Sequence, residues 1–144
     1  MTEQSTKLPL AVLPTPLQEL DRLGEALGGP RLLVKRDDLT GLGMGGNKVR
    51  KLEYLVADAR AQGATTLITA GAPQSNHARQ TAAAAARCGL QRVLVLGPTA
   101  PSTLNGNLLL DRLFGARIRW AGARDRFAVM DEVAAEERAA GRTP

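Results

Sequence analysis

The sequence predicts an α/β fold in which helices cover a parallel sheet. Short apolar runs rich in Val, Leu and Ile alternate with longer segments that repeat apolar residues at helical spacing. Nearly every segment ends at a glycine, the usual residue after a helix or at a turn. The chain has 144 residues, of which 44% are hydrophobic and 3% aromatic. This length suits one domain with an aliphatic core.

The first forty residues are expected to form an extended segment, a helix and a strand. The run Leu13-Pro14-Thr15-Pro16-Leu17 is predicted to be extended, because a residue before proline avoids the helical region. A helix is expected over residues 18–27, where Gly28-Gly29-Pro30 ends it. A short strand follows over residues 31–36.

Beyond this strand, helices and strands alternate. The expected helices are 47–62, 76–87, 103–114 and 126–140. The expected strands between them are 65–70, 92–96 and 117–120. Ligands of parallel sheets bind beyond the carboxyl ends of the strands. The loops 37–46 and 71–76, which hold unusual residues, are therefore the candidate ligand-binding loops.

Composition argues against several classes of partner. The net charge is +5 and the sequence pI about 10.1, but the arginines are scattered without a basic run or interleaved aromatics, so nucleic-acid binding is not expected.

Cys88 is the only cysteine, which excludes a disulfide within the chain and favours a reducing compartment. No signal peptide and no apolar run of about 18 residues is evident, so a cytoplasmic protein without membrane contact is expected.

The loop before the helix at 47 matches a dinucleotide fingerprint by letter only. Gly41-x-Gly43-x-x-Gly46 has the spacing, but Asp37-Asp38-Leu39-Thr40 separates it from the strand. Two carboxylates there would repel a pyrophosphate, and the strand at 65–70 has no acid at its end for a ribose. The P-loop pattern fails as well, because neither Ser nor Thr follows Lys48.

Lys48 is the informative residue of this loop. The chain contains four lysines and fifteen arginines, yet Lys48 and Lys51 both lie in the first turn of a predicted helix. An amine can lose its proton and form a Schiff base, which a guanidinium cannot. The positive end of the helix dipole favours the neutral amine. An ordinary solvated surface lysine is the alternative that spacing alone leaves open.

The loop 71–76 leads into a second helix start. Ser75 or Asn76 can cap that helix, and its free N–H groups can receive a carboxylate, although capping alone would explain both residues. His77 is the only histidine, and its side chain diverges from Ser75 by about 200° of helical rotation, which argues against a hydrolase triad. A second histidine or a cysteine pair for a metal is missing. Cys88 is expected to be a packing residue.

The motifs together resemble a known family. They are Lys35-Arg36-Asp37-Asp38, Gly45-Gly46-Asn47-Lys48-x-Arg50-Lys51-Leu52-Glu53 and Gln74-Ser75-Asn76-His77-x-Arg79-Gln80, with Leu13-Pro14-Thr15-Pro16-Leu17 and Asn105-Gly106-Asn107-Leu108-Leu109 in support. In this order they resemble the pyridoxal-phosphate enzymes of the D-cysteine desulfhydrase and 1-aminocyclopropane-1-carboxylate deaminase family. The resemblance covers nearly the whole chain. It implies the tryptophan-synthase-β-like fold, fold type II, with helices on both faces of the sheet.

The resemblance also implies a cofactor, pyridoxal 5'-phosphate, and the residues that bind it. Lys48 would carry the cofactor as a Schiff base, next to Asn47. Asn76 would lie by its ring and phenolic oxygen, and Lys51 near its phosphate. No metal is implied.

The substrate residues follow from the same resemblance. Ser75 and the helix start would receive the substrate carboxylate, with Asn76 and His77 beside it. His77 follows the desulfhydrase branch, since the deaminase branch typically has glutamine there. Lys48 or Ser75 would move the proton at the substrate Cα, and the resemblance leaves open which of the two does so.

The implied reaction is α,β-elimination of D-cysteine to pyruvate, hydrogen sulfide and ammonia. The alternatives are cyclopropane-ring opening by a deaminase and elimination from another substrate such as L-cysteate. Outside this class, the chain could be a non-catalytic α/β fragment that binds a small anion or a partner chain. A nucleotide-dependent oxidoreductase is disfavoured by the context of the glycine loop.

Family members are roughly twice this long. The resemblance therefore implies that residues 1–40 pack on a large domain and that 41–144 form the small cofactor-facing domain. The phosphate-binding glycine loop, the partner of the pyridine nitrogen and a tyrosine near the substrate would lie in the C-terminal half. The fold is expected to be incomplete without that half, and the isolated chain weakly active or inactive. The full-length form is expected to be a homodimer.

Overall fold

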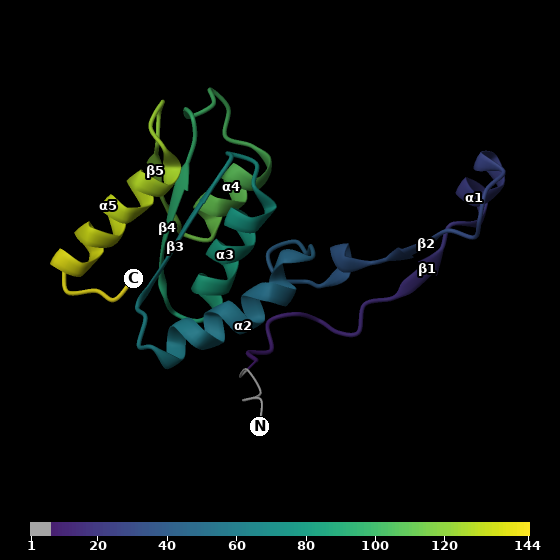
Figure 1. Cartoon of the computed structure of the whole chain (residues 1–144), viewed down its shortest axis with the longest axis horizontal. Coiled ribbons are helices and arrows are strands. Elements are labelled where there is room, and N and C mark those ends of the chain that lie inside the picture. Colours follow the sequence, from purple (N-terminus) through teal and green to yellow (C-terminus); the bar gives the residue numbers. More distant parts are fainter. Residues whose placement is uncertain (1–6) are drawn as a thin grey trace.

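The computed structural model describes residues 7–144, which form a central α/β unit and a projecting arm (Figure 1). The central unit holds a three-stranded sheet in the order β3-β4-β5. Its strands are β3 (Thr66–Gly71), β4 (Gln91–Leu96) and β5 (Arg117–Trp120). Its helices are α2 (Lys48–Ala61), α3 (Asn76–Arg87), α4 (Gly106–Leu113) and α5 (Arg126–Ala139). The prediction of alternating strands and helices is confirmed.

The sheet is parallel throughout, as predicted. Thr66 of β3 pairs with Gln91 of β4, and Val93 of β4 pairs with Arg117 of β5. All three strands therefore end at one edge of the sheet, where α3 begins directly after β3. Parallel strands require such crossover connections, and the helices supply them.

Helices cover both faces of the sheet, in agreement with the expected fold type. Side chains alternate along each strand, so that Leu94 and Leu96 pack with α3 and α4, whereas Val93 and Val95 pack against α5. Leu67 of β3 contacts a further cluster between α2 and α3. Figure 1 shows α5 on one side of the strands and α2, α3 and α4 on the opposite side.

The arm differs from the expectation for residues 18–27. It consists of β1 (Leu17–Glu19), α1 (Asp21–Leu27) and β2 (Leu33–Lys35), followed by a single 3-10 turn, η1 (Asp37–Leu39). The predicted helix is therefore wrong in its first residues. Leu17 pairs antiparallel with Lys35 and Glu19 with Leu33, and this pairing overrides the weak helical pattern.

The start of α4 also differs. The sequence predicts a helix from residue 103, but the chain becomes helical only at Gly106, with Asn105 as the preceding cap residue. The side chain of Gln74 accepts a hydrogen bond from the Asn107 N–H at 2.8 Å, so a residue of a distant loop satisfies this helix end. The remaining boundaries agree with the predictions within one or two residues.

Cys88 follows α3 and packs, partly buried, against the cluster between α2 and α3, as expected for a small core residue. Within residues 7–144, no helix has the length and apolar character needed to cross a membrane.

Candidate active site

The glycine loop folds tightly before α2. Gly45 has a φ of +73°, and a Cβ atom there would lie 1.8 Å from the Asp38 carbonyl oxygen. Only glycine fits this position. The hydroxyl of Thr40 bridges the loop, because it donates to the Gly46 carbonyl oxygen and accepts from the Gly46 N–H, both at 2.9 Å. The loop therefore delivers the chain to Lys48 along a fixed path.

The two aspartates before this loop are engaged by arginines. Arg50 donates to both oxygens of Asp37, at 2.8 and 2.6 Å, and holds the pKa of that carboxyl below its usual value. Arg36 forms the equivalent pair with Asp38 and lowers its pKa. Each carboxylate is thus charge-paired, which weakens the repulsion of a bound anion that the sequence led us to expect.

Lys48 is the first residue of α2. Asn47 is its cap residue, although the Asn47 side chain makes no capping hydrogen bond. Lys48 is half-buried and Lys51, one turn later, is exposed. Among the ion pairs of residues 7–144, none involves Lys48 or Lys51. Both amines are thus available to an anionic ligand in this part of the chain.

The cap of α3 is Ser75, which resolves the choice between Ser75 and Asn76. The Ser75 hydroxyl oxygen accepts the Ala78 N–H at 3.2 Å. The side chain lies against the end of β3, because a Cβ on Gly71 would come within 2.8 Å of the Ser75 Cβ. The helix start is therefore seated at the carboxyl edge of the sheet, where ligands of parallel sheets bind.

A network from α4 fixes the loop before α3. The side-chain amide of Asn107 donates to the Gln74 carbonyl oxygen at 2.7 Å and to the Asn76 Oδ1 at 2.9 Å. Gln74 in turn accepts the Asn107 N–H through its own side chain. The orientation of Asn76 is therefore determined by a residue 31 positions away.

Two neighbouring residues of α3 reach across to the glycine loop. Arg79 Nη2 and Gln80 Nε2 both donate to the Gly45 carbonyl oxygen, each at 2.6 Å. Arg79 also donates to Asn107 Oδ1 at 3.1 Å. No role was predicted for Arg79 or Asn107 from the sequence, although both lie in the motifs that resemble the family. A charged residue at the start of an otherwise alanine-rich helix was the available signal.

His77 lies beside the two lysines. Burial lowers its pKa, and the positive charges of Lys51 and Lys48 lower it further. The imidazole is therefore neutral at physiological pH. It borders a small pocket of about 120 Å³ whose other walls are mostly aliphatic. Its Nδ1 atom is buried without a hydrogen-bond partner among residues 7–144.

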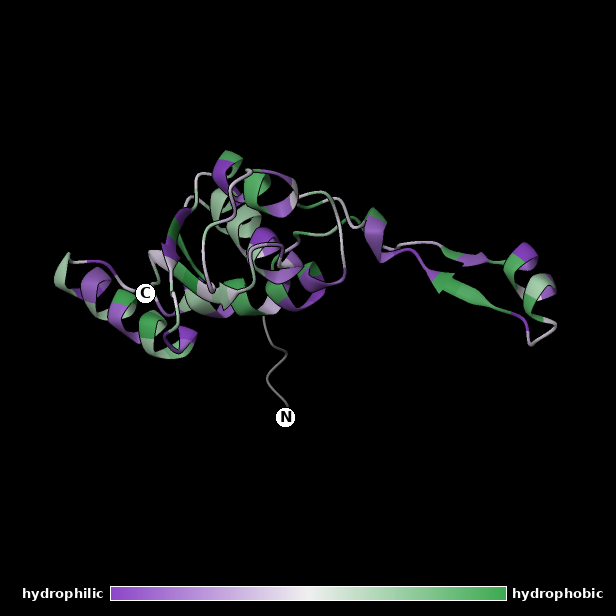
Figure 2. Ribbon diagram, turned by 90° about the horizontal axis from the view of Figure 1, so that it is seen from above, coloured by the Kyte–Doolittle hydropathy of each residue, from purple (hydrophilic) through white to green (hydrophobic). Residues whose placement is uncertain are grey.

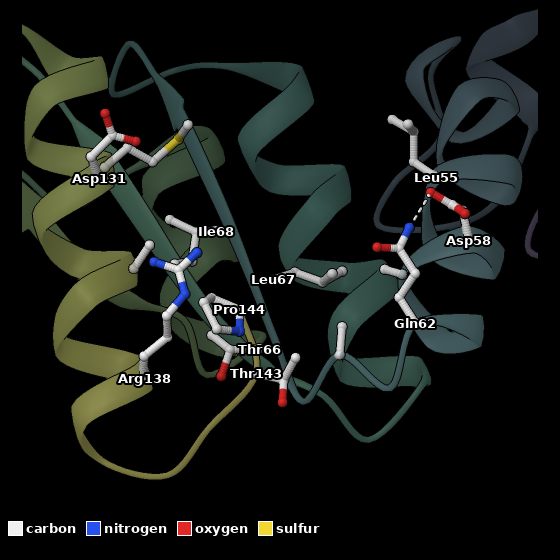
Figure 3. A pocket seen from close by; sticks show the side chains of 14 residues that line it. Leu55, Asp58, Gln62, Thr66, Leu67, Ile68, Asp131, Arg138, Thr143 and Pro144 are labelled. Atoms are coloured by element: carbon white, nitrogen blue, oxygen red, sulfur yellow. Dashed lines mark hydrogen bonds between the residues drawn. The ribbon is translucent and has the colours of Figure 1, made fainter.

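A larger depression of about 350 Å³ lies between α2 and α5 along β3, and it shares Leu55, Leu67 and Ile68 with the pocket beside His77 (Figure 3). Leu55, Ile68 and Arg138 are among its lining residues. None of the residues predicted for the site lines it, and it gathers no group of catalytic character. We therefore place the candidate site at the starts of α2 and α3.

This arrangement suits an anionic cofactor with a group that reacts with an amine. Two helix starts present free N–H groups, and two lysines add positive charge. Asn76 offers an oriented amide. Within residues 7–144, no group of three or more histidine, cysteine or acidic side chains is placed to hold a metal ion.

Comparison with known proteins agrees with this chemistry. Residues 8–143 match the family of pyridoxal-phosphate dependent enzymes. The chain belongs to this family. Its fold is accordingly that of the family, and the resemblance noted from the sequence motifs is confirmed.

Several individual members of the family are similar to this chain over most of its length. The chain is 51% identical to a D-cysteine desulfhydrase of Klebsiella pneumoniae subsp. pneumoniae, covering 96% of this chain and 44% of that protein. It is 55% identical to the D-cysteine desulfhydrase of Salmonella paratyphi B, over 81% of this chain and 37% of that protein. A crystal structure of a homologue of ACC deaminase superposes with a TM-score of 0.89 at 43% identity. The superposition covers 98% of this chain and 43% of the chain in that structure.

The chain thus spans less than half the length of these family members. Residues in the rest of their sequences have no counterpart among these 144 residues. The candidate site therefore corresponds to residues in only part of these relatives' chains.

Proposed function

We propose that this chain provides the lysine-bearing part of a pyridoxal-phosphate dependent lyase that acts on D-cysteine. The observation that supports this most strongly is the placement of Lys48 at the start of α2, joined through Gly45 and Arg79 to the start of α3. The identity of 51–55% to D-cysteine desulfhydrases supports the choice of substrate.

In this proposal the residues have distinct roles toward the cofactor. Lys48 holds the cofactor covalently through its ε-amine. Asn47, whose side chain makes no capping hydrogen bond, would contact the cofactor beside Lys48, and Lys51 would contribute positive charge for the phosphate. Asn76, whose Oδ1 accepts a hydrogen bond from Asn107, would offer its side-chain N–H groups to the cofactor.

The substrate is bound by the neighbouring helix start. The free N–H groups of α3 and the Ser75 hydroxyl receive the substrate carboxylate. The neutral imidazole of His77 borders the aliphatic pocket and suits an uncharged side chain such as that of cysteine.

The net reaction converts D-cysteine and water into pyruvate, hydrogen sulfide and ammonia. The bound cofactor supplies an electron sink for the Cα carbon of the substrate. The ε-amine of Lys48 would be the base that accepts the Cα proton of the substrate. Ser75 is the alternative carrier of this proton, and the kinetics of the Ser75→Ala variant distinguish the two carriers.

A deaminase acting on 1-aminocyclopropane-1-carboxylate is the second candidate, favoured by the 43% identity to the homologue of ACC deaminase. Incubation with each substrate separates the two: D-cysteine would yield sulfide and pyruvate, whereas the cyclopropane acid would yield oxobutyrate and ammonia. A non-catalytic fragment that binds a small anion would yield neither set of products.

Covalent labelling tests the central assignment. The chain is mixed with pyridoxal phosphate, reduced with borohydride and digested, and the labelled lysine is mapped by mass spectrometry. We expect the label on Lys48 and its loss in Lys48→Ala. Lys35 of the arm offers a matched control, since Lys35→Ala should retain the label on Lys48. Predominant labelling of another lysine would overturn the assignment.

A further inference from the structure

Arg79 is a buried cation close to the candidate site. Only 8% of it is exposed, and it lies one turn after the cap residue Ser75. Removal of a guanidinium from water is unfavourable unless its N–H groups find partners. The identity of those partners therefore indicates what the residue is for.

The two ends of the guanidinium reach two different loops. Nη2 donates to the Gly45 carbonyl oxygen at 2.6 Å, three residues before Lys48. Nη1 donates to Asn107 Oδ1 at 3.1 Å, and Asn107 donates in turn to Asn76 Oδ1 at 2.9 Å. A single side chain thus connects the path into Lys48 with the side chain of Asn76.

A nearby carboxylate is left unused. Asp111 of α4 is fully buried, and neither of its oxygens has a hydrogen-bond partner among residues 7–144. Its charge is felt by Arg79, whose Nε atom also lacks a partner there. Arginine and a carboxylate often form a bidentate pair, and among residues 7–144 no such pair joins Arg79 to Asp111. Arg79 instead bonds two neutral oxygens that flank the candidate site.

We infer that Arg79 is a positioning residue, which sets the distance and orientation of Lys48 relative to Asn76. This inference rests on the proposed role of Lys48 as the cofactor-binding amine. Asp111 is near enough for its charge to act on Arg79, but it occupies none of the donors that make the bridge.

The test compares Arg79→Met with Arg87→Met. Arg87 lies at the other end of the same helix and is exposed, with one long hydrogen bond to the Leu10 carbonyl oxygen. The first readout needs no cofactor: amide hydrogen exchange of the peptides covering 41–48 and 74–77. We expect the amides of both segments to exchange faster in Arg79→Met and at the wild-type rate in Arg87→Met. Unchanged exchange in both segments would overturn the bridge.

The second readout is the ratio of borohydride-fixed label on Lys48 to that on Lys51. Loss of positioning should lower this ratio by about tenfold, since small displacements of a reacting group have effects of this size or larger. Arg79→Lys should restore part of the ratio, because one donor and the charge remain. A folded Arg79→Met with the wild-type ratio would contradict the positioning role while leaving the assignment of Lys48 intact.

If the wild-type chain carries no label on Lys48, the proposed function fails, and hydrogen exchange alone then decides whether the bridge exists. If Arg79→Met does not fold, Asn107→Ala provides the second variant. It removes the far end of the bridge at a partly exposed position. We expect it to accelerate exchange over 74–77 and to lower the labelling ratio. Neither change occurring would overturn the inference.

Discussion

Gly45 is the tightest point of the loop that leads to Lys48. Two effects oppose a side chain at Gly45: its positive φ and the close approach of the Asp38 carbonyl oxygen. Gly63 separates them, because it has a similar φ of +76° but a Cβ atom there would meet nothing within 4 Å. Gly63→Ala should therefore cost about 1–2 kcal/mol from backbone strain alone. Gly45→Ala should cost clearly more, because the loop must also open to relieve the overlap.

Urea unfolding of the two variants measures this difference. Gly45→Ala should in addition lose the preferential labelling of Lys48, whereas Gly63→Ala should keep it. Equal losses of stability in both variants would mean that the loop relaxes without difficulty.

Asp111 is a buried acid whose charge is poorly compensated. Burial raises its pKa to about 6, and the charge of Arg79 offsets only part of this. Because the folded state binds this proton more tightly than the unfolded state, the charged form destabilises the fold above pH 6, and the penalty vanishes as the pH falls toward 4. Asp111→Asn should therefore raise stability at pH 7.5 by about 1–3 kcal/mol.

Thermal denaturation at pH 7.5 and pH 4.5 tests this. The gain should be large at the higher pH and small at the lower. A gain of equal size at both values would show that removal of the charge is not its cause. Asp58→Asn changes an exposed residue of α2 and should leave the stability unchanged at both pH values.

The contributions of sequence and structure differ from residue to residue. Lys48 and Ser75 could be singled out because their residue types at two helix starts suit amine chemistry and capping. Arg79 and Asn107 could not, because their partners lie 34 and 31 positions away. Only the packing of α3 between the glycine loop and α4 brings these groups together.

At the scale of elements, β3 has one unpaired edge in the described part of the chain. The carbonyl oxygens of Thr65 and Gly71 accept N–H groups from the β4 side, whereas the Thr66 N–H donates to the Thr143 carbonyl oxygen on the other side. The alternation of a parallel ladder then turns the N–H groups of Ile68 and Ala70 to the open edge. Figure 3 shows the depression beside this edge, with Ile68 and Thr66 labelled on its floor and Leu55 and Arg138 at its sides.

An open strand edge favours association of copies of the chain. Ala70→Pro removes an N–H from the open edge without loss of a bond to β4, so it should reduce concentration-dependent association. Thr69→Pro removes an N–H that faces β4 and should disrupt the sheet. Sedimentation and circular dichroism distinguish these results. Equal association in Ala70→Pro and the wild-type chain would show that this edge is not the contact.

The elements also show where sequence patterns suffice. Helices α2, α3 and α5 follow from apolar spacing and terminal glycines, and the central strands from their aliphatic runs. The strand β1 could not be predicted, since its three residues are exposed and are ordered only by pairing with β2. The start of α4 could not be placed from the sequence, because its first N–H partner comes from Gln74.

At the scale of the whole molecule, the arm stands apart from the central unit (Figures 1 and 2). No residue of α1 is buried, and Leu17, Leu27 and Leu33 are 62%, 67% and 48% exposed. A two-stranded sheet with so little buried surface is marginal by itself. We propose that residues 1–40 pack on the part of the fold that the longer family members possess and this chain does not include.

Limited proteolysis tests this proposal in two steps. In the 144-residue chain, trypsin should cut after Arg22 and Arg31 before it cuts within α3, because sites with few buried contacts open with little free-energy cost. Addition of the C-terminal part of the Klebsiella desulfhydrase, the region that the chain does not match, should then protect the arm. Leu27→Lys should abolish this protection without a change in the melting temperature of the isolated chain, since the side chain is mostly exposed there. An arm that resists trypsin as well as α3 does, before any addition, would show that it needs no further surface.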